Sequence, residues 1–191
     1  MMTEIGRPRD PRIDDAVLRA TVDLIGTTAF ADLSVDAIAR KAGTSKPAIY
    51  RRWPSKAHLV HEAVFPIDEA AELPDTGSLD GDVREMVRRT VDVLTTPAAM
   101  AALPGLVGEM AADLTLHAAL LERFGGILSR GLTDRLRDAA ARGEVRPEVT
   151  AADMTEAVAG ITFLALLTRG ATLDDAWIDR TTMLITRGIC P

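Results

Sequence analysis

Apolar residues recur at helical spacing along most of the chain. Between residues 11 and 25 they form a one-sided stripe at Ile13, Ala16, Val17, Ala20, Leu24 and Ile25. This spacing is typical of an amphipathic helix, and no stretch shows the strict alternation of a half-buried strand. The pattern predicts an all-α protein of about nine helices.

The first helix is expected to begin at Asp10 and Pro11 and to end near Gly26. Phe30 and Leu33 follow, and we expect both side chains to fill the core from the connecting turn. The next 30 residues then alternate between short apolar patterns and turn residues, which predicts three short helices.

The turn residues place the ends of these short helices. Ser34 caps the second helix, and Gly43 stands where a left-handed C-cap belongs. Thr44 or Ser45 caps the third, which can run only to about Trp53 because the following proline disfavours helical geometry there. The fourth helix is capped by Ser55 and ends near Pro66.

Residues 66–78 contain two prolines and a glycine and form the best candidate linker. We therefore divide the chain into residues 1–64 and residues 65–191. Five further helices are predicted, at about 79–95, from Thr96-Pro97 onward, at 115–142, at 151–169 and at 173–188. The last two open on capping-box spacings, Thr150 to Asp153 and Thr172 to Asp175.

The second and third helices have the dimensions of a helix-turn-helix. A third helix of about seven residues spans roughly 10 Å, which suits a major groove about 12 Å wide. The apolar residues seat the pair on its neighbours, so the remaining side chains are expected to face outward: Ser45, Lys46, Pro47, Ala48, Arg51 and Arg52.

These outward residues are suited to DNA. Ala48 can contact a thymine methyl, and Thr44 or Ser45 can hydrogen-bond to bases or phosphate. Lys46, Arg51 and the Tyr50 hydroxyl are natural phosphate or guanine partners. Lys56 and Ser34 stand at helix N-termini, where free N–H groups favour one phosphate each. Trp53 is more typical of core, and for Arg52 a place on a solvated face and a DNA role are equally open.

Charge agrees with this division. Residues 1–64 hold 10 Lys and Arg against 8 Asp and Glu, whereas residues 65–191 hold 12 against 20. A basic end on an acidic body indicates that one end meets a polyanion. The charged N-terminus, the single Cys190 and the absence of any apolar run near 20 residues favour a cytoplasmic protein without a membrane span.

The stretch SVDAIARKAGTSKPAIYRRWPSKAHLV, residues 34–60, resembles the TetR-type transcriptional regulators. The resemblance implies a homodimer with an N-terminal three-helix helix-turn-helix domain and a C-terminal ligand-binding and dimerisation bundle. It also implies DNA contacts by Ser34, Thr44, Ser45, Lys46, Pro47, Ala48, Tyr50 and Lys56. Thr44 replaces the usual valine and Trp53 the commoner phenylalanine, and Arg51-Arg52 is unusually basic, so no operator sequence follows.

Two features of the body bear on dimerisation. The segment from Ala157 to Leu167 is apolar nearly all round, so it needs a partner beyond its subunit or a central place in it. The resemblance implies that the last two helices pair with their copies in a four-helix interface. The expected interface residues are Val158, Ile161, Leu164, Trp177, Thr181, Leu184, Ile185 and Gly188, with plain intramolecular core as the alternative.

A small-molecule effector would bind among the helices between residues 79 and 169. Methionines and other apolar residues there can line an adaptable pocket, although each one taken alone is more typical of the hydrophobic core. The candidate walls are Met86, Thr90, Leu94, Leu103, Met110, Leu114, His117, Leu121, Phe124, Phe163 and Leu166. Gly125, Gly126 and Gly131 interrupt one helix and suggest a bend or close packing there.

Other functions find less support. His58 and His61 are one helical turn apart, but their order matches no zinc-protease motif and no third ligand is evident. We expect both on the solvent side of the fourth helix, and we expect no metal, no cofactor and no enzymatic activity. The sequence GRPR, residues 6–9, resembles the core of a minor-groove arm or is simply a basic tail. A body that docks another protein instead of a small molecule stays open.

Together with the resemblance, which implies the homodimer, the ligand response and repression as the default, the sequence predicts a regulator that binds double-stranded DNA at a near-palindromic operator and is released by a small, largely apolar effector.

Overall fold

The computed structural model describes residues 11–66, 75–118, 132–170 and 172–190, and every regular element in these ranges is a helix. The N-terminal part, here called the head, contains α1 (Pro11–Ile25), α2 (Val35–Lys41), α3 (Lys46–Tyr50) and α4 (Lys56–Val64). The remainder, here called the body, contains α5 (Leu79–Leu94), α6 (Pro97–Ala112), α8 (Leu132–Ala141), α9 (Ala151–Arg169) and α10 (Asp175–Ile189). The all-α prediction is confirmed, while the boundary after residue 64 stays a prediction.

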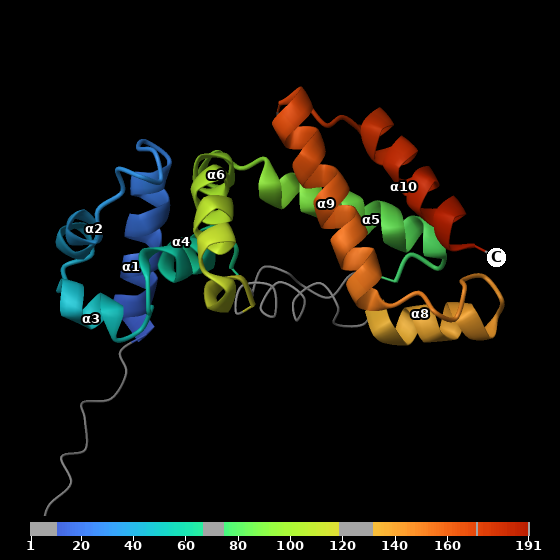
Figure 1. Cartoon of the computed structure of the whole chain (residues 1–191), viewed down its shortest axis with the longest axis horizontal. Coiled ribbons are helices and arrows are strands. Elements are labelled where there is room, and N and C mark those ends of the chain that lie inside the picture. Colours follow the sequence, from blue (N-terminus) through green and yellow to red (C-terminus); the bar gives the residue numbers. More distant parts are fainter. Residues whose placement is uncertain (1–10, 67–74, 119–131, 171, 191) are drawn as a thin grey trace, which may run out of the picture.

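The head is organised around α1, which packs against α2 and α4 (Figure 1). Its core is built from side chains that are almost completely buried: Val17, Ile25, Ile38, Ile49, Leu59 and Val60. Phe30 and Leu33 are also buried, as expected for residues that fill this core from the connecting turn. The apolar face of α1 thus packs against the short helices α2 and α4.

Local side-chain bonds define the short helices. The hydroxyl of Ser45 accepts a hydrogen bond from the Ala48 N–H at 3.3 Å, and that of Ser55 accepts one from the His58 N–H at 3.3 Å. Gly43 has a φ of 66°, the left-handed conformation that the sequence predicts. Helix α3 ends at Tyr50, three residues before the expected limit at Trp53.

The body is organised around α5, which packs against both α9 and α10 (Figure 1). Helix α9 opens with the predicted capping box, in which Thr150 and Asp153 bond each other's backbone and side chain. The capping box predicted at Thr172 is wrong. Helix α10 is capped by Asp174, whose carboxylate accepts a hydrogen bond from the Trp177 N–H at 2.8 Å.

The helix expected over residues 115–142 is only partly within the described ranges. Residues 114–118 are helical, and α8 ends before Gly143, whose φ is 73°. The segment between them, with Gly125, Gly126 and Gly131, lies outside the described residues.

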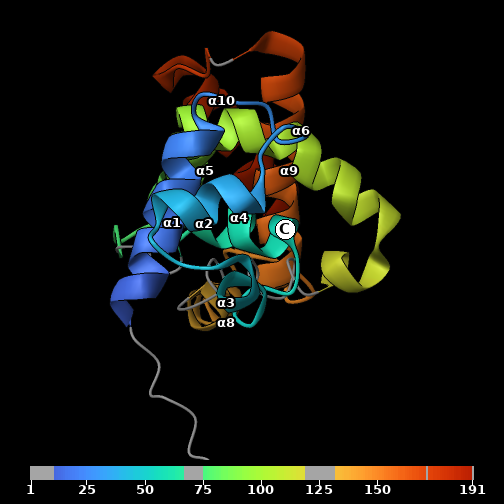
Figure 2. The same cartoon turned by 90° about the vertical axis from the view of Figure 1, so that its left-hand side faces the viewer.

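Helix α6 stands at the junction of head and body. It packs against α1 and α4 on one side and against α5 on the other. Its axis turns by 87° relative to α5 at the break after Leu94. Figures 1 and 2 show the two helices running in different directions. A displacement of α6 would therefore act directly on the head.

Among the described residues, α9 is the one helix that is long and apolar enough to cross a membrane, and α5 with α6 would qualify if the bent pair were a single span. The buried face of α9 packs against α5, as in the core helix of a bundle. The pattern noticed between Ala157 and Leu167 is thus partly satisfied within the protomer.

Candidate nucleic-acid interface

The exposed side of α2 and α3 carries most of the residues expected to contact DNA. Pro47 and Arg51 are exposed, and Tyr50 is 43% exposed. Thr44 is partly buried. The Ser45 hydroxyl accepts the capping bond described above, so its O–H remains able to donate to a phosphate.

Ser34 occupies the N-cap position of α2 and is exposed, but its side chain makes no capping hydrogen bond. Its hydroxyl is therefore not committed to the helix end, unlike the hydroxyl of Ser45 at the start of α3. The Ser34 hydroxyl is therefore available to donate to a phosphate or to accept from another group.

Lys46 is tied to the helix that precedes it. Its Nζ donates a hydrogen bond to Asp36 Oδ2 of α2 at 2.8 Å, which raises the pKa of the lysine. Both side chains are exposed. The contact holds the cation across the two helices of the helix-turn-helix, and a DNA phosphate would compete with the carboxylate for it.

Two residues expected to face outward do not. The side chain of Ala48 is only 9% exposed, because α3 is so short that both Ala48 and Ile49 pack into the core. Arg52 forms an ion pair with Asp14 of α1, and the two side chains are 15% and 18% exposed. The outward orientation predicted for Ala48 and Arg52 is wrong, and so is the solvated position left open for Arg52.

Lys56 lies at the first position of α4 and is partly buried. Its Nζ donates a 2.8 Å hydrogen bond to the carbonyl of Phe30, and the carbonyl of Ala31 lies at 3.4 Å. The same atom stands 4.4 Å from the centroid of the Phe30 ring. The sequence placed Lys56 at a helix N-terminus but contained no signal for this attachment to the turn after α1.

Trp53 and His61 are structural residues of the head. Trp53 is buried, and its indole N–H donates to Glu62 Oε2 at 2.9 Å. His61 is 2% exposed, so its expected solvent position is wrong. The reason is that α4 is covered by α1 on one side and by α6 on the other. In the described part of the chain no three His, Cys, Asp or Glu side chains gather as a metal site.

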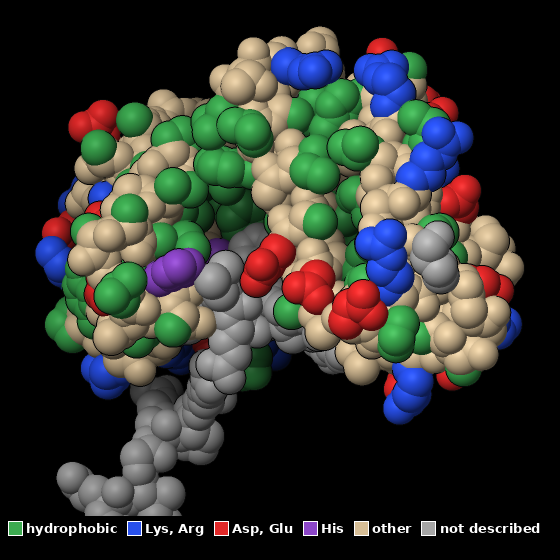
Figure 3. Space-filling view, turned by 45° about the vertical axis from the view of Figure 1, so that its right-hand side comes forward, with side chains coloured by type: hydrophobic (Ala, Val, Ile, Leu, Met, Phe, Trp, Pro, Cys, Tyr) green, Lys and Arg blue, Asp and Glu red, His purple; other side chains and the backbone are tan. Residues whose placement is uncertain are grey.

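The predicted dimer residues divide into two sets. Val158, Trp177, Thr181 and Ile185 are buried inside the protomer, so for these four the alternative of intramolecular core applies and the interface prediction is corrected. Leu164 and Leu184 are 61% and 65% exposed, Gly188 is exposed, and Ile161 is partly buried. Leu167 and Met183 extend the exposed apolar set. Figure 3 shows hydrophobic side chains gathered on this face.

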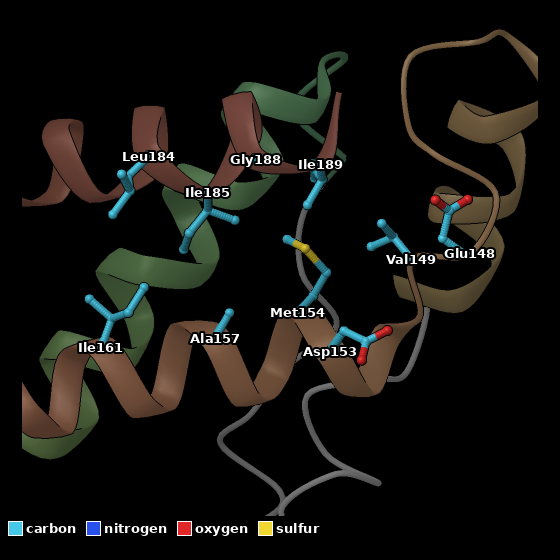
Figure 4. Close-up of a pocket in the computed structure, with 10 residues that line it drawn as sticks. All are labelled: Glu148, Val149, Asp153, Met154, Ala157, Ile161, Leu184, Ile185, Gly188 and Ile189. Atoms are coloured by element: carbon cyan, nitrogen blue, oxygen red, sulfur yellow. The ribbon is translucent and has the colours of Figure 1, made fainter. Parts of the chain in front are cut away.

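A groove lies between α9 and α10 (Figure 4). Its volume is about 420 Å³, and apolar side chains from both helices point into it. Carboxylates stand at one end. Its lining consists of Glu148, Val149, Asp153, Met154, Ala157, Ile161, Leu184, Ile185, Gly188 and Ile189. The groove thus belongs to the face with the exposed leucines and not to the predicted effector site.

The predicted effector residues are mostly in the body core. Met86, Thr90, Leu94 and Leu166 are buried, Leu103, Met110, His117 and Phe163 are partly buried, and Leu114 is 78% exposed. Leu121 and Phe124 lie outside the described residues, as does the GRPR segment ahead of α1. The structure therefore brings the α5 and α9 members of this set together and leaves Leu114 apart.

Comparison with known proteins gives two family matches that cover most of the chain. Residues 17–63 match the model of the bacterial regulatory proteins of the tetR family. Residues 73–185 match the model of the tetracyclin repressor-like C-terminal domain. The matches correspond to the head and the body.

Individual relatives agree with these matches. The chain is 31% identical to the DNA-binding transcriptional repressor TetR of Mycobacteroides abscessus over 170 residues, which is 86% of this chain and 87% of that protein. It is 26% identical to the HTH-type transcriptional regulator YdeS of Bacillus subtilis over 99% of this chain and 96% of that one. The crystal structure of the TetR family transcription regulator SCO0332 superposes with a TM-score of 0.69 at 26% identity, covering 94% of this chain and 99% of the other.

Proposed function

Because the chain belongs to the TetR family of transcriptional regulators, we propose that it is a ligand-responsive repressor. In this proposal a homodimer binds a near-palindromic operator, and a small, largely apolar effector releases it. The observation that supports DNA reading most directly is the exposed side of α2 and α3. It combines an uncommitted Ser34 hydroxyl, the Lys46 ammonium and the exposed Tyr50 and Arg51 side chains.

The proposed geometry follows from twofold symmetry. Two copies of α3 held about 34–36 Å apart reach successive major grooves of one DNA face. Helix α3 has five residues, so it spans roughly 7.5 Å and enters the groove with its N-terminal turn. Ser45, Lys46 and Pro47 lie in that turn, while Tyr50, Arg51 and Lys56 are proposed to contact phosphates. Ala48 has little surface of its own to offer a base.

The DNA-binding proposal is tested by selection from a random-sequence duplex pool with the unaltered protein. Enrichment of a near-palindrome is expected. Lys46→Ala should then weaken binding to the selected duplex by about tenfold and reduce the salt slope by about one per subunit. Arg142→Ala removes the same charge from the exposed end of the body and should leave both quantities unchanged. Failure to enrich any duplex at low salt would refute DNA reading.

An effector is proposed to bind in the body because the head alone contains the DNA-reading elements. Support comes from Thr162 and Thr182, whose buried hydroxyl oxygens make no hydrogen bond within the described part of the chain. A buried hydroxyl of this kind costs about 1–3 kcal/mol, which a polar group of an effector would offset. Thr162 lies one helical turn from Leu166 on the buried face of α9.

Thermal unfolding of the full chain, screened against apolar metabolites, tests the effector. A compound that binds the folded dimer raises the melting temperature by mass action. A true effector also lowers the affinity for the selected duplex, because it binds more tightly to a dimer whose two α3 helices have a different spacing. A body that responds to no compound but retains a specific protein from solution would favour a protein partner instead. We place this regulator in the cytoplasm, where its proposed operator lies.

A further inference from the structure

Phe30 joins three parts of the molecule although it lies in the connection between α1 and α2. Its side chain is 6% exposed, whereas its neighbours Ala29 and Ala31 are exposed. One side of the residue meets Lys56 at the start of α4, and another meets Gly105 of α6. A single aromatic residue thus connects the turn after α1 with both α4 and α6.

The contact with Lys56 is made by both the backbone and the ring of Phe30. The lysine Nζ donates to the Phe30 carbonyl at 2.8 Å, has the Ala31 carbonyl at 3.4 Å and stands 4.4 Å from the ring centroid. An ammonium has three N–H donors. Two of them are directed at the carbonyls, so one remains for a further acceptor such as a phosphate.

The contact with Gly105 is too close for any other residue. A Cβ built on Gly105 would lie 2.2 Å from Cδ1, 2.3 Å from Cγ and 2.6 Å from Cβ of Phe30. The neighbouring Gly108 lies on the same helix, and a Cβ there would meet nothing within 4 Å. The glycine at position 105 is therefore required by the approach of Phe30, and α6 fixes where the aromatic ring sits.

We propose that Phe30 is a positioning residue for DNA binding, which holds the Lys56 ammonium at the α4 N-terminus so that its third N–H faces a DNA phosphate. Gly105 has no side chain, so the Phe30 ring can pack directly against α6 at this position. The inference rests on the proposed function, because it takes Lys56 as a phosphate contact. It adds residues outside the helix-turn-helix to the DNA-binding apparatus and connects them to the body.

The contact between Phe30 and Lys56 can be measured without DNA through the reactivity of the lysine amine. The chain has only three lysines, Lys41, Lys46 and Lys56, so each can be followed separately. Brief acetylation with trace acetic anhydride, followed by peptide mass spectrometry, gives the reactivity of each. Phe30→Leu removes the ring but keeps an apolar side chain. We expect Lys56 to react about fivefold faster in this variant, the factor that corresponds to a lost cation–π contact, with Lys41 unchanged. Equal Lys56 reactivity in the two proteins would overturn the proposal.

A double-mutant cycle measures the consequence for DNA. Phe30→Leu should weaken binding to the duplex selected by the unaltered protein about fivefold, and should have no effect when Lys56→Met is already present. Equal loss in both backgrounds would show that Phe30 merely supports the fold. A gain in affinity would show that the Phe30 ring competes with phosphate for the ammonium. Either result overturns the positioning role.

Gly105→Ala and Gly108→Ala complete the test. The first should displace Phe30, accelerate the labelling of Lys56 and weaken DNA binding through Lys56. The second is the matched control on the same helix and should change neither quantity. If Phe30→Leu or Gly105→Ala accelerates the labelling of Lys56 but the unaltered protein selects no duplex, the contact between Phe30 and Lys56 is supported. The proposed DNA-binding function is then refuted instead.

Discussion

At the scale of single residues, the charge cluster on α5 shows how strongly arginines can hold a carboxylate. Glu85 accepts hydrogen bonds from Arg88 at 2.7 and 2.8 Å and from Arg89 at 2.7 Å. The bonds from Arg88, followed by those from Arg89, lower its pKa from 4.5 to about 2, against an opposing effect of burial. The carboxylate side chain is 18% exposed, so solvent screens the cluster only in part.

The depressed pKa predicts the pH range in which Glu85 stabilises the fold. Its contribution is fully present above the unfolded value of 4.5 and is lost as pH falls toward about 2. Glu85→Gln should lower the free energy of unfolding by about 1 kcal/mol at pH 7, with the deficit shrinking between pH 5 and pH 2. Urea titrations at several pH values and one protein concentration measure this. A deficit that stays constant down to pH 2 would exclude titration of Glu85 as its source.

Residues whose role depends on near neighbours in sequence could be predicted, and those with distant partners could not. Ser45 and Ser55 cap the helices that immediately follow them; turn chemistry identified Ser55 and narrowed the other cap to Thr44 or Ser45. Arg52 pairs with Asp14 across the packed head, and no local pattern shows that contact. His61 was misplaced because α4 is covered on two sides, whereas a helical stripe indicates only one.

At the scale of elements, the sequence predicted two capping boxes of which one formed. The spacing at Thr150 and Asp153 and that at Thr172 and Asp175 look equivalent. In the structure Asp174 competes for the second helix end, because its carboxylate reaches the Trp177 N–H at 2.8 Å. Two potential caps two residues apart cannot both be used, and spacing alone does not decide between them.

This difference gives a paired prediction. Thr150→Ala should destabilise the protein by about 1 kcal/mol, because the hydroxyl of Thr150 and the carboxylate of Asp153 satisfy each other's N–H groups. Thr172→Ala should cost almost nothing, since this exposed hydroxyl makes only a 3.4 Å contact with the Arg169 carbonyl. Chemical denaturation of both variants compares them directly. Equal losses would show that the second box forms in solution.

At the scale of the whole molecule, the protomer leaves an apolar face that its own fold does not cover. Leu164 on α9 and Leu184 on α10 are 61% and 65% exposed, and Leu184 lines the groove between the two helices. Isolated exposed leucines are ordinary, but two exposed leucines on adjoining helices beside an apolar groove are typical of an interaction surface. We propose that a copy of the same face covers it, because an interface across a twofold axis is formed by the same surface of both subunits.

The oligomeric state of a charged variant tests this arrangement. Leu184→Glu places two carboxylates in the proposed interface, one from each subunit, and should raise the dimer dissociation constant by at least about a hundredfold, equivalent to roughly 2.7 kcal/mol. Val93→Glu is the matched control, since Val93 is a 42% exposed apolar residue of α5 outside this face. Sedimentation velocity over a concentration series measures both. If the Leu184 variant stays dimeric at the concentrations where the control does, dimerisation uses another surface. The two copies of α3 would then have to be spaced by contacts elsewhere in the body.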